Sequence, residues 1–276
     1  FVDRSFLKEG GLRKLVEEDG LTGVTSNPSI FEKAMGQGTA YDDQYKAFVT
    51  ANPGASVVET YEALAIKDIQ DACDTLRPVF DRLDGKDGYV SLEVSPYLAN
   101  DTDKTIDEAR RLSKMVDRPN LMIKVPGTRA GVPAIRQLIE DGISINVTLL
   151  FAREAYIAVA MAFVEGLEAR LTKGETIDRI ASVASFFVSR IDSAIDKKID
   201  ERVAAGDKDA DALKAVRGKV AIANAKLAYQ WYLDFVKSDR WKKLAAEGAM
   251  PQRLLWASTG TKDPSFPDTL YIDALI

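Results

Sequence analysis

The sequence predicts an α/β protein that folds as a (β/α)8 TIM barrel with a helical insertion, its first strand largely missing from this chain. Short strand-like apolar runs alternate with longer helical patterns, as repeated βα units in a parallel sheet require. The length of 276 residues suits such a barrel, which takes about 250 residues. Polar residues also recur on one face of several strand-like runs, and a barrel would bring those faces together at its axis.

Seven segments are typical of strands, because each is short, rich in apolar residues and bounded by helical or turn patterns. They are Gly23–Asn27, Tyr89–Ser95, Leu121–Val125, Ser144–Leu150, Ser182–Val188, Leu254–Ser258 and Leu270–Ala274. Helical patterns precede and separate them, at Ser5–Glu18, Gly54–Val79, Thr105–Val116, Val132–Glu140 and Phe151–Leu171. These elements alternate as the strands and helices of a barrel do.

Both ends of the chain look cut. The first helix precedes the first visible strand, so an earlier strand should feed it, and Phe1-Val2 would be the tail of that strand. We expect residues 1–276 to be a single barrel domain of a longer protein. The charged helical segment at about 192–248 is interpreted as a cover on one βα connection, in preference to a separate module.

The composition excludes several classes of function. Lys and Arg number 37 against 42 Asp and Glu, with no basic stripe, which argues against nucleic acid or a membrane surface as partner. No apolar run reaches the ~20 residues of a membrane span, and no signal peptide is visible. The absence of histidine excludes Ser-His-Asp and Cys-His catalysis and the common zinc sites, and we expect no metal.

The single cysteine, Cys73, rules out an internal disulfide and fits a reducing cytoplasm. It lies in a helical pattern between Asp71 and Asp74. Because neighbouring acids raise the pKa of a thiol, we interpret Cys73 as a packing residue and not as a nucleophile.

Lys124 is the most informative residue, because it lies inside the apolar run Leu121–Gly127. Lysine is almost never fully buried without compensation for its charge. Desolvation favours the neutral amine, which is a nucleophile that can form a Schiff base with a carbonyl substrate. The alternative is a lysine whose stem crosses the strand and whose ammonium reaches solvent.

Polar side chains recur at every second position of the strands around this lysine. Ser144, Asn146 and Thr148 share one strand face, and Glu93 lies among small hydroxyls in its own strand. Ser185 belongs to a further strand. Both faces of a parallel sheet are normally apolar, so we expect these polar faces to converge near Lys124, where Glu93 would offset its desolvation. A purely structural polar network is the alternative.

Four motifs together resemble the transaldolase family, in its long-chain bacterial branch, over essentially the whole chain. They are Gly23-Val24-Thr25-Ser26-Asn27-Pro28-Ser29, Ile123-Lys124-Val125-Pro126-Gly127-Thr128, Asn146-Val147-Thr148-Leu149-Leu150-Phe151 and Ser185-Phe186-Phe187-Val188-Ser189-Arg190. The resemblance implies a class I mechanism in a (β/α)8 barrel, with no organic cofactor. Its expected substrates are sugar phosphates of the non-oxidative pentose phosphate pathway.

The resemblance also implies roles for individual residues. Lys124 matches the Schiff-base lysine, and Glu93 and Thr148 match a pair that holds a catalytic water, with Glu93 as the acid–base group. Asn27 and Asn146 match residues that bind the dihydroxyacetone unit, although an Asn-Pro turn would also explain Asn27. The remaining substrate-binding candidates are Ser185, Phe187, Arg190, Ser258 and Lys262.

Arg190 and Ser258 match the phosphate site of the family, and a guanidinium suits bidentate phosphate binding. Relatives often carry a second basic residue two positions after the serine, where this chain has Gly260. Lys262 is the candidate to replace it.

The family also has a first-strand aspartate that acts as a general base, and it would precede Phe1. Asp3 is not assigned that role. A protein that truly began at Phe1 would have severely reduced activity and an unclosed barrel. Some relatives fuse the barrel to a glucose-6-phosphate isomerase domain, so a fused or partner isomerase is an open alternative, and the sequence does not fix the oligomeric state.

Two other functions compete with transfer of a dihydroxyacetone unit. The related fructose-6-phosphate aldolases are lyases that resemble this chain around the lysine, but they tend to have glutamine in place of Glu93 and a tyrosine near Phe187. A non-catalytic barrel that binds sugar phosphate would keep Arg190 and Ser258 and be indifferent to Lys124. Transfer is favoured because the catalytic positions carry the transaldolase residues together.

Overall fold

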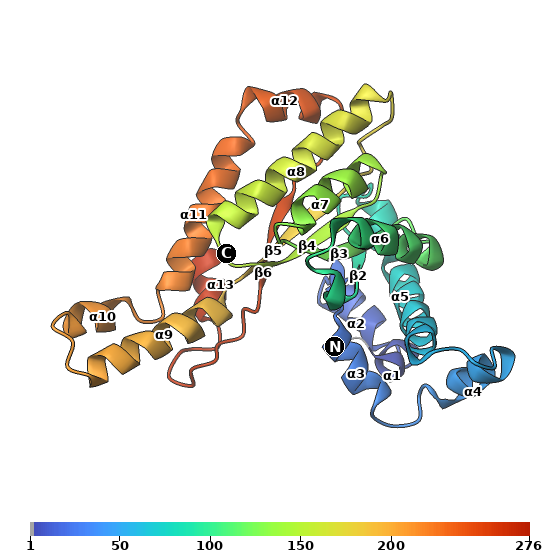
Figure 1. Cartoon of the computed structure of the whole chain (residues 1–276), viewed down its shortest axis with the longest axis horizontal. Coiled ribbons are helices and arrows are strands. Elements are labelled where there is room, and N and C mark those ends of the chain that lie inside the picture. The colour runs from blue at the N-terminus through green and yellow to red at the C-terminus, as the bar shows by residue number, and fades with distance from the viewer. Residues whose placement is uncertain (1–2) are drawn as a thin grey trace.

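The computed structural model describes residues 3–276, and its centre is a curled, fully parallel sheet of six strands (Figure 1). The strands lie side by side in chain order, with β1 and β6 at the two edges of the sheet. Their bounds are β1 Gly23–Thr25, β2 Tyr89–Glu93, β3 Leu121–Pro126, β4 Ile145–Leu150, β5 Ser182–Phe187 and β6 Arg253–Ala257. The predicted α/β class with a parallel sheet is therefore confirmed.

Helices connect successive strands, as parallel neighbours require. Helices α6, α7 and α8 lie beside one another along the outside of the sheet (Figure 1). The helices are α1 Arg4–Lys8, α2 Gly11–Glu18, α3 Pro28–Met35, α4 Asp42–Ala51, α5 Val57–Arg82, η1 Pro96–Leu98, α6 Thr102–Val116, α7 Gly131–Glu140, α8 Arg153–Thr172, α9 Ser189–Ala204, α10 Ala210–Val216, α11 Val220–Phe235, α12 Asp239–Ala246 and α13 Leu270–Leu275.

The core lies between the outer face of the sheet and this helical layer. Ile123, Val125, Ile145 and Val147 of the sheet are fully buried, and so are apolar residues of α7 and α8 such as Leu138. Alternate strand residues point to opposite faces. The apolar residues of β3 and β4 therefore pack on the helices, and the polar residues between them face the inside of the curled sheet.

The prediction of a strand at Leu270–Ala274 is wrong, because this segment forms α13. Tyr271 is buried and its hydroxyl donates a hydrogen bond to Asp192 at 2.9 Å. Thr269 also donates to Asp273, four residues later, at 2.8 Å. A short, continuous apolar run has no period that separates a strand from a helix, so tertiary packing decides the outcome.

The first predicted helix, Ser5–Glu18, is two helices, α1 and α2. The chain turns at Gly10, whose φ of 78° lies in the left-handed region that glycine tolerates. Helices α3 and α4 were not predicted from the sequence. The expected strand tail at Phe1-Val2 lies outside the described residues.

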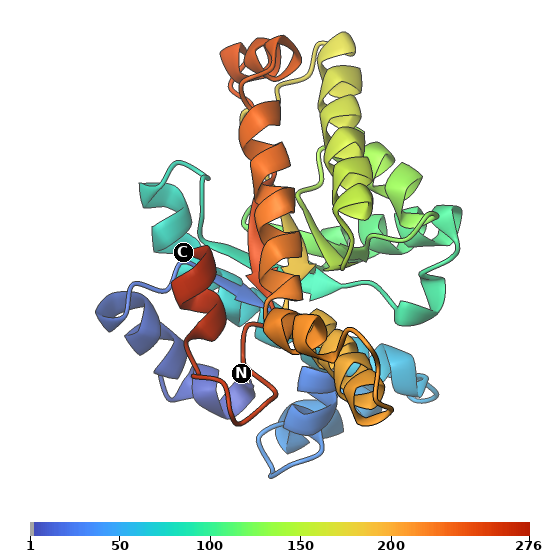
Figure 2. The same ribbon diagram turned by 90° about the vertical axis from the view of Figure 1, so that its left-hand side faces the viewer.

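The predicted insertion is helical and comprises α9 to α12 with their connections. Its helix α11 runs alongside α8, as the orange and yellow helices of Figure 2 show. Within residues 3–276, no helix is both long enough and apolar enough to cross a membrane.

Candidate active site

Lys124 lies in the middle of the sheet, beside the two residues that the sequence predicted for its neighbours. In the register of the parallel strands it is paired with Glu93 of β2 and with Asn146 of β4. Its ammonium donates to Glu93 Oε2 at 3.0 Å and to the carbonyl oxygen of Ser26 at 3.3 Å. Only 10% of the Lys124 side chain and 14% of the Glu93 side chain are exposed, so each charge offsets the desolvation of the other.

A chain of hydrogen bonds joins the polar residues of β2, β4 and β5. The Asn146 amide donates to the Ser91 hydroxyl at 3.0 Å, and the Ser185 hydroxyl donates to Asn146 Oδ1 at 2.8 Å. All three side chains are buried. The network fixes both ends of the Asn146 amide, and it confirms that the polar strand faces converge beside Lys124.

Thr148 lies two residues after Asn146 on β4 and is 1% exposed. Its strand is irregular here, because the pairing with β5 shifts between Val147 and Leu150, and Leu149 has a φ of 60°. Such a bulge re-aims the side chains next to it. Within residues 3–276 the Thr148 hydroxyl makes no hydrogen bond, so the structure does not join it directly to Glu93.

Asn27 does not sit in the strand, since β1 ends at Thr25. Its side-chain oxygen accepts a hydrogen bond from the backbone N–H of Ile30 at 3.0 Å, and Pro28 is the first residue of α3. Asn27 is therefore a helix N-cap, as Asn followed by Pro favours. Asp3 is likewise the N-cap of α1, where it accepts from Phe6 at 2.9 Å.

The predicted phosphate residues come together where β5 and β6 end. Ser258 Oγ and Ser189 Oγ are 2.8 Å apart, and the Ser189 N–H donates to the carbonyl oxygen of Ser258 at 3.0 Å. Arg190, the next residue, is exposed, and its guanidinium lies 4.8 Å from the centre of the Phe187 ring. Ser258 has a φ of 57°, so both irregular positions, Leu149 and Ser258, follow strands of the site.

Lys262 lies in the loop after β6 and is exposed. A Cβ atom placed on Gly260 would be 4.0 Å from Lys262 Nζ. The ammonium of Lys262 therefore occupies the neighbourhood in which a basic residue at position 260 would begin. No carboxylate within residues 3–276 forms an ion pair with it.

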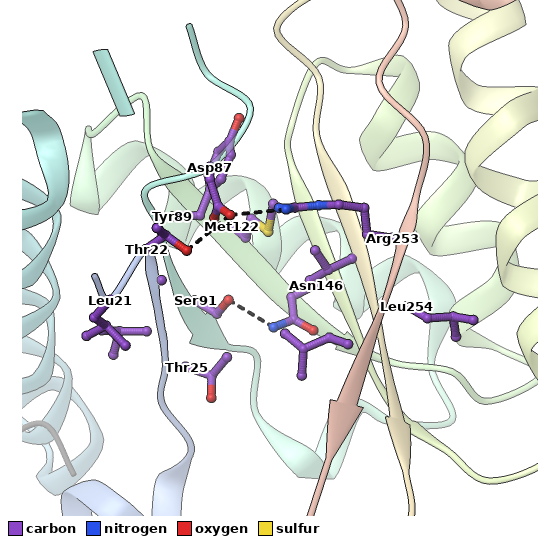
Figure 3. A pocket seen from close by; sticks show the side chains of 14 residues that line it. Leu21, Thr22, Thr25, Asp87, Tyr89, Ser91, Met122, Asn146, Arg253 and Leu254 are labelled. Carbon is purple, nitrogen blue, oxygen red and sulfur yellow. Dashed lines mark hydrogen bonds and ion pairs between the residues drawn. The ribbon is translucent and has the colours of Figure 1, made fainter. Parts of the chain in front are cut away.

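A cavity of about 430 Å³ opens between the edge strands β1 and β6 (Figure 3). Asn146 and Ser91 line it and are joined by their hydrogen bond. At the other end, Asp87 pairs with Arg253 at 3.1 Å and accepts from Thr22 at 3.2 Å. Lys124 and Glu93 do not line this cavity, so the reactive pair and the hollow are separate features that share Asn146.

Sequence reasoning missed two participants. The backbone carbonyl of Ser26 accepts from Lys124, and no sequence pattern reports a carbonyl direction. Ser189 contacts Ser258, and its place beside Arg190 in the quoted motif was a signal that could have found it.

The fold and the site define a class of enzyme: a parallel α/β protein in which a buried lysine, paired with a carboxylate, can attack a carbonyl carbon. The chain matches the transaldolase/fructose-6-phosphate aldolase family over residues 1–276. It therefore belongs to that family.

Curated relatives agree with this assignment. The chain is 53% identical over 277 residues to a transaldolase of Trichodesmium erythraeum, with 100% of this chain and 72% of the relative covered. It is 52% identical over 278 residues to transaldolase 2 of Nostoc punctiforme, again with 100% and 72% covered. For a transaldolase of Thermobifida fusca the identity is 49% over 275 residues, with 100% and 73% covered.

These relationships identify the chain as an enzyme with transaldolase function. Each of these relatives is named only as a transaldolase, so the comparisons give no support to a fused isomerase.

Proposed function

We propose that the chain transfers a dihydroxyacetone unit between sugar phosphates through a Schiff base on Lys124. The amine nitrogen bonds to the keto carbon of fructose 6-phosphate or sedoheptulose 7-phosphate, and the carbonyl oxygen leaves as water. The bond between C3 and C4 then breaks, and its electrons pass into the iminium to leave an enamine. The enamine adds to the aldehyde of glyceraldehyde 3-phosphate or erythrose 4-phosphate, and hydrolysis frees the lysine. The observation that carries this proposal is the buried Lys124–Glu93 pair, 3.0 Å apart.

Glu93 is the acid–base group of this proposal. A lysine must lose a proton before it can attack a carbonyl, and the Glu93 carboxylate is the acceptor in direct contact with it. Once protonated, Glu93 can return the proton to the oxygen that leaves as water. Thr148, whose hydroxyl is unengaged by the described residues, would hold that water beside Glu93. The proton from the C4 hydroxyl would pass to the aspartate that the family resemblance places before Phe1.

Asn146 and Ser185 would orient the dihydroxyacetone unit, because their hydrogen bonds to each other and to Ser91 fix their positions beside the lysine. Asn27 can contribute only through its amide N–H groups while its oxygen caps α3. Phe187 would pack against the carbon chain of the substrate and support Arg190 from below.

The phosphate group would bind at Arg190, Ser258 and Lys262. Arg190 pairs with no carboxylate of the described residues, so its guanidinium can accept an anion in bidentate geometry. It is the second residue of α9, and the backbone N–H groups that begin a helix favour negative charge. Lys262 would supply the second positive charge.

The same proposal places residues 1–276 in one catalytic domain, acting in the cytoplasm in the non-oxidative pentose phosphate pathway. A lyase of the fructose-6-phosphate aldolase type is the second candidate, since the family includes both activities. Glu93 and Phe187, in place of glutamine and tyrosine, favour transfer over cleavage.

Replacement of the reactive pair tests the proposal. We expect Lys124→Met to abolish transfer from fructose 6-phosphate to erythrose 4-phosphate, because no other amine takes its place. Glu93→Gln should lower kcat about 10²- to 10⁴-fold, the usual contribution of a general acid–base group. Lys104→Met is the matched control, because Lys104 lies on the exposed face of α6 and pairs only with Asp101.

Circular dichroism and urea unfolding show whether each variant is folded. Turnover in folded Lys124→Met that is comparable to the wild type would contradict the Schiff-base proposal. Sugar-phosphate binding without turnover in the wild type would favour a binding protein instead.

A further inference from the structure

We propose that Arg217, in the helical insertion, is a positioning residue that holds the loop carrying Lys262 in place for the substrate phosphate. The inference rests on the proposed function, because it concerns the phosphate end of the same site. It assigns a role in substrate binding to a residue of the insertion that lies in none of the motifs of the sequence.

Arg217 joins three separate parts of the chain. It ends α10, and its guanidinium bonds to both carboxylate oxygens of Asp200 on α9, at 3.0 and 3.2 Å. The same guanidinium donates to Asp263, in the loop after β6, at 2.7 Å. It also lies 5.4 Å from the centre of the Phe266 ring. Two carboxylates and one aromatic ring therefore fix a single side chain whose exposed fraction is 28%.

The loop is held at its other end as well. Ser258, where the loop leaves β6, contacts Ser189 at the start of α9 through both side chain and backbone. Asp263 in turn accepts from the backbone N–H and the hydroxyl of Ser265, at 2.8 and 2.7 Å. Lys262 lies between these two attachments and directly precedes Asp263. The position of Asp263 therefore limits where the Lys262 ammonium can reach.

Charge gives Arg217 a second effect. A hollow of about 650 Å³ is lined by Lys262 and by carboxylates that include Asp192, Asp196, Asp200 and Asp263. Arg217 neutralises two of these, Asp200 and Asp263. Without it, both carboxylates would attract the nearest free ammonium, and Lys262 would turn toward them. With it, Lys262 pairs with no carboxylate of the described residues and stays available for a phosphate dianion.

Kinetics with paired acceptors measure this role. For Arg217→Met we expect the KM of erythrose 4-phosphate to rise about tenfold, the worth of one charged hydrogen bond. The kcat should stay within about twofold, and the KM of unphosphorylated erythrose should not change. Asp263→Asn should give the same pattern, and Arg217→Lys should recover part of the loss, because lysine keeps the charge but not the fork of donors.

Arg202→Met is the matched control. Arg202 lies in the same insertion and pairs with Asp207 at 2.7 Å, but both residues are remote in sequence from the loop after β6. Its KM values should equal those of the wild type. The dissociation constant of inorganic phosphate, measured by calorimetry on each folded variant, gives the same comparison without turnover.

An unchanged KM for erythrose 4-phosphate in folded Arg217→Met would overturn the inference. So would an equal loss for phosphorylated and unphosphorylated acceptors, because that result describes general damage to the fold. Failure of the proposed function has a different signature, since the wild type itself would then show no transfer.

Discussion

At the scale of the residue, the unusual feature of this chain is a lysine and a glutamate that share a nearly closed site. Removal of either partner leaves an uncompensated charge, which typically costs about 3–5 kcal/mol of stability. The two are neighbours in register on parallel strands, so their contact follows from the sheet itself and requires no long loop. This is why a lysine within an apolar run was a reliable signal in the sequence.

Cys73 gives a residue-scale prediction that depends on pH. It is fully buried, and burial, aided by Asp74, raises the pKa of its thiol to about 12. Because the raised pKa keeps the thiol protonated at pH 8, only about a thousandth of the usual thiolate remains to react. We expect native protein to resist iodoacetamide at pH 8 and to label fully in urea. Rapid labelling of the native protein would contradict the packing role of Cys73.

At the scale of the element, Gly131 positions the start of α7 directly after the strand that carries Lys124. A Cβ atom on Gly131 would overlap the carbonyl oxygen of Pro126, and neither backbone can yield without moving the end of β3. We expect Gly131→Ala to lower the free energy of unfolding by about 3 kcal/mol and to reduce kcat, as measured by urea unfolding and by a transfer assay.

Gly174→Ala is the control for this prediction. Its Cβ would meet nothing within 4 Å, although its φ of 77° is unfavourable for alanine, so the expected cost is about 1 kcal/mol. Equal costs at the two positions would show that the close approach at Gly131 carries no special weight.

The elements that sequence analysis located well are the ones with a strong period or a clear bound. The helical pattern at Val132–Glu140 and the strand at Ser182–Val188 match α7 and β5 to within a residue or two. The segment at Leu270–Ala274 failed because six residues of mixed apolar sequence have no distinctive period, and the contact of Tyr271 with Asp192 selects the helix. Helix α3 had a signal, Asn27 followed by Pro28, which was interpreted as a turn.

The candidate site was predictable to the same physical limit. Side-chain alternation placed Asn146 and Thr148 on one face of β4, and the structure bears this out for Asn146 through its contacts. The bulge at Leu149 was not predictable, because a left-handed leucine has no sequence signature. The contacts of Ser258 and Arg217 join segments far apart in the chain, and only tertiary packing sets them.

At the scale of the whole molecule, a second buried ion pair ties the N-terminal helix to the rest of the fold. Arg4 of α1 donates to Asp68 of α5 at 2.8 Å, and Tyr41, which precedes α4, donates to the other oxygen of Asp68 at 2.7 Å. The side chains of Arg4 and Asp68 are 6% and 0% exposed. Three helices therefore meet on one carboxylate.

This cluster predicts a non-additive pair of substitutions. Arg4→Met should cost about 3–5 kcal/mol of unfolding free energy, because Asp68 is left buried without its cation. Adding Asp68→Asn removes that charge while keeping an acceptor for Tyr41, so the double variant should be more stable than Arg4→Met alone. Urea unfolding of the wild type, both single variants and the double variant measures the coupling. Strictly additive losses would contradict a buried ion pair.

The central claim is that Lys124 forms a covalent bond with the ketose substrate. The most direct test is borohydride reduction of the protein with fructose 6-phosphate and no acceptor, followed by peptide mass mapping. We predict a reduced dihydroxyacetone adduct on Lys124 alone, which later addition of erythrose 4-phosphate before reduction would diminish. A folded, intact protein that yields no adduct, or an adduct on another lysine, would contradict the account.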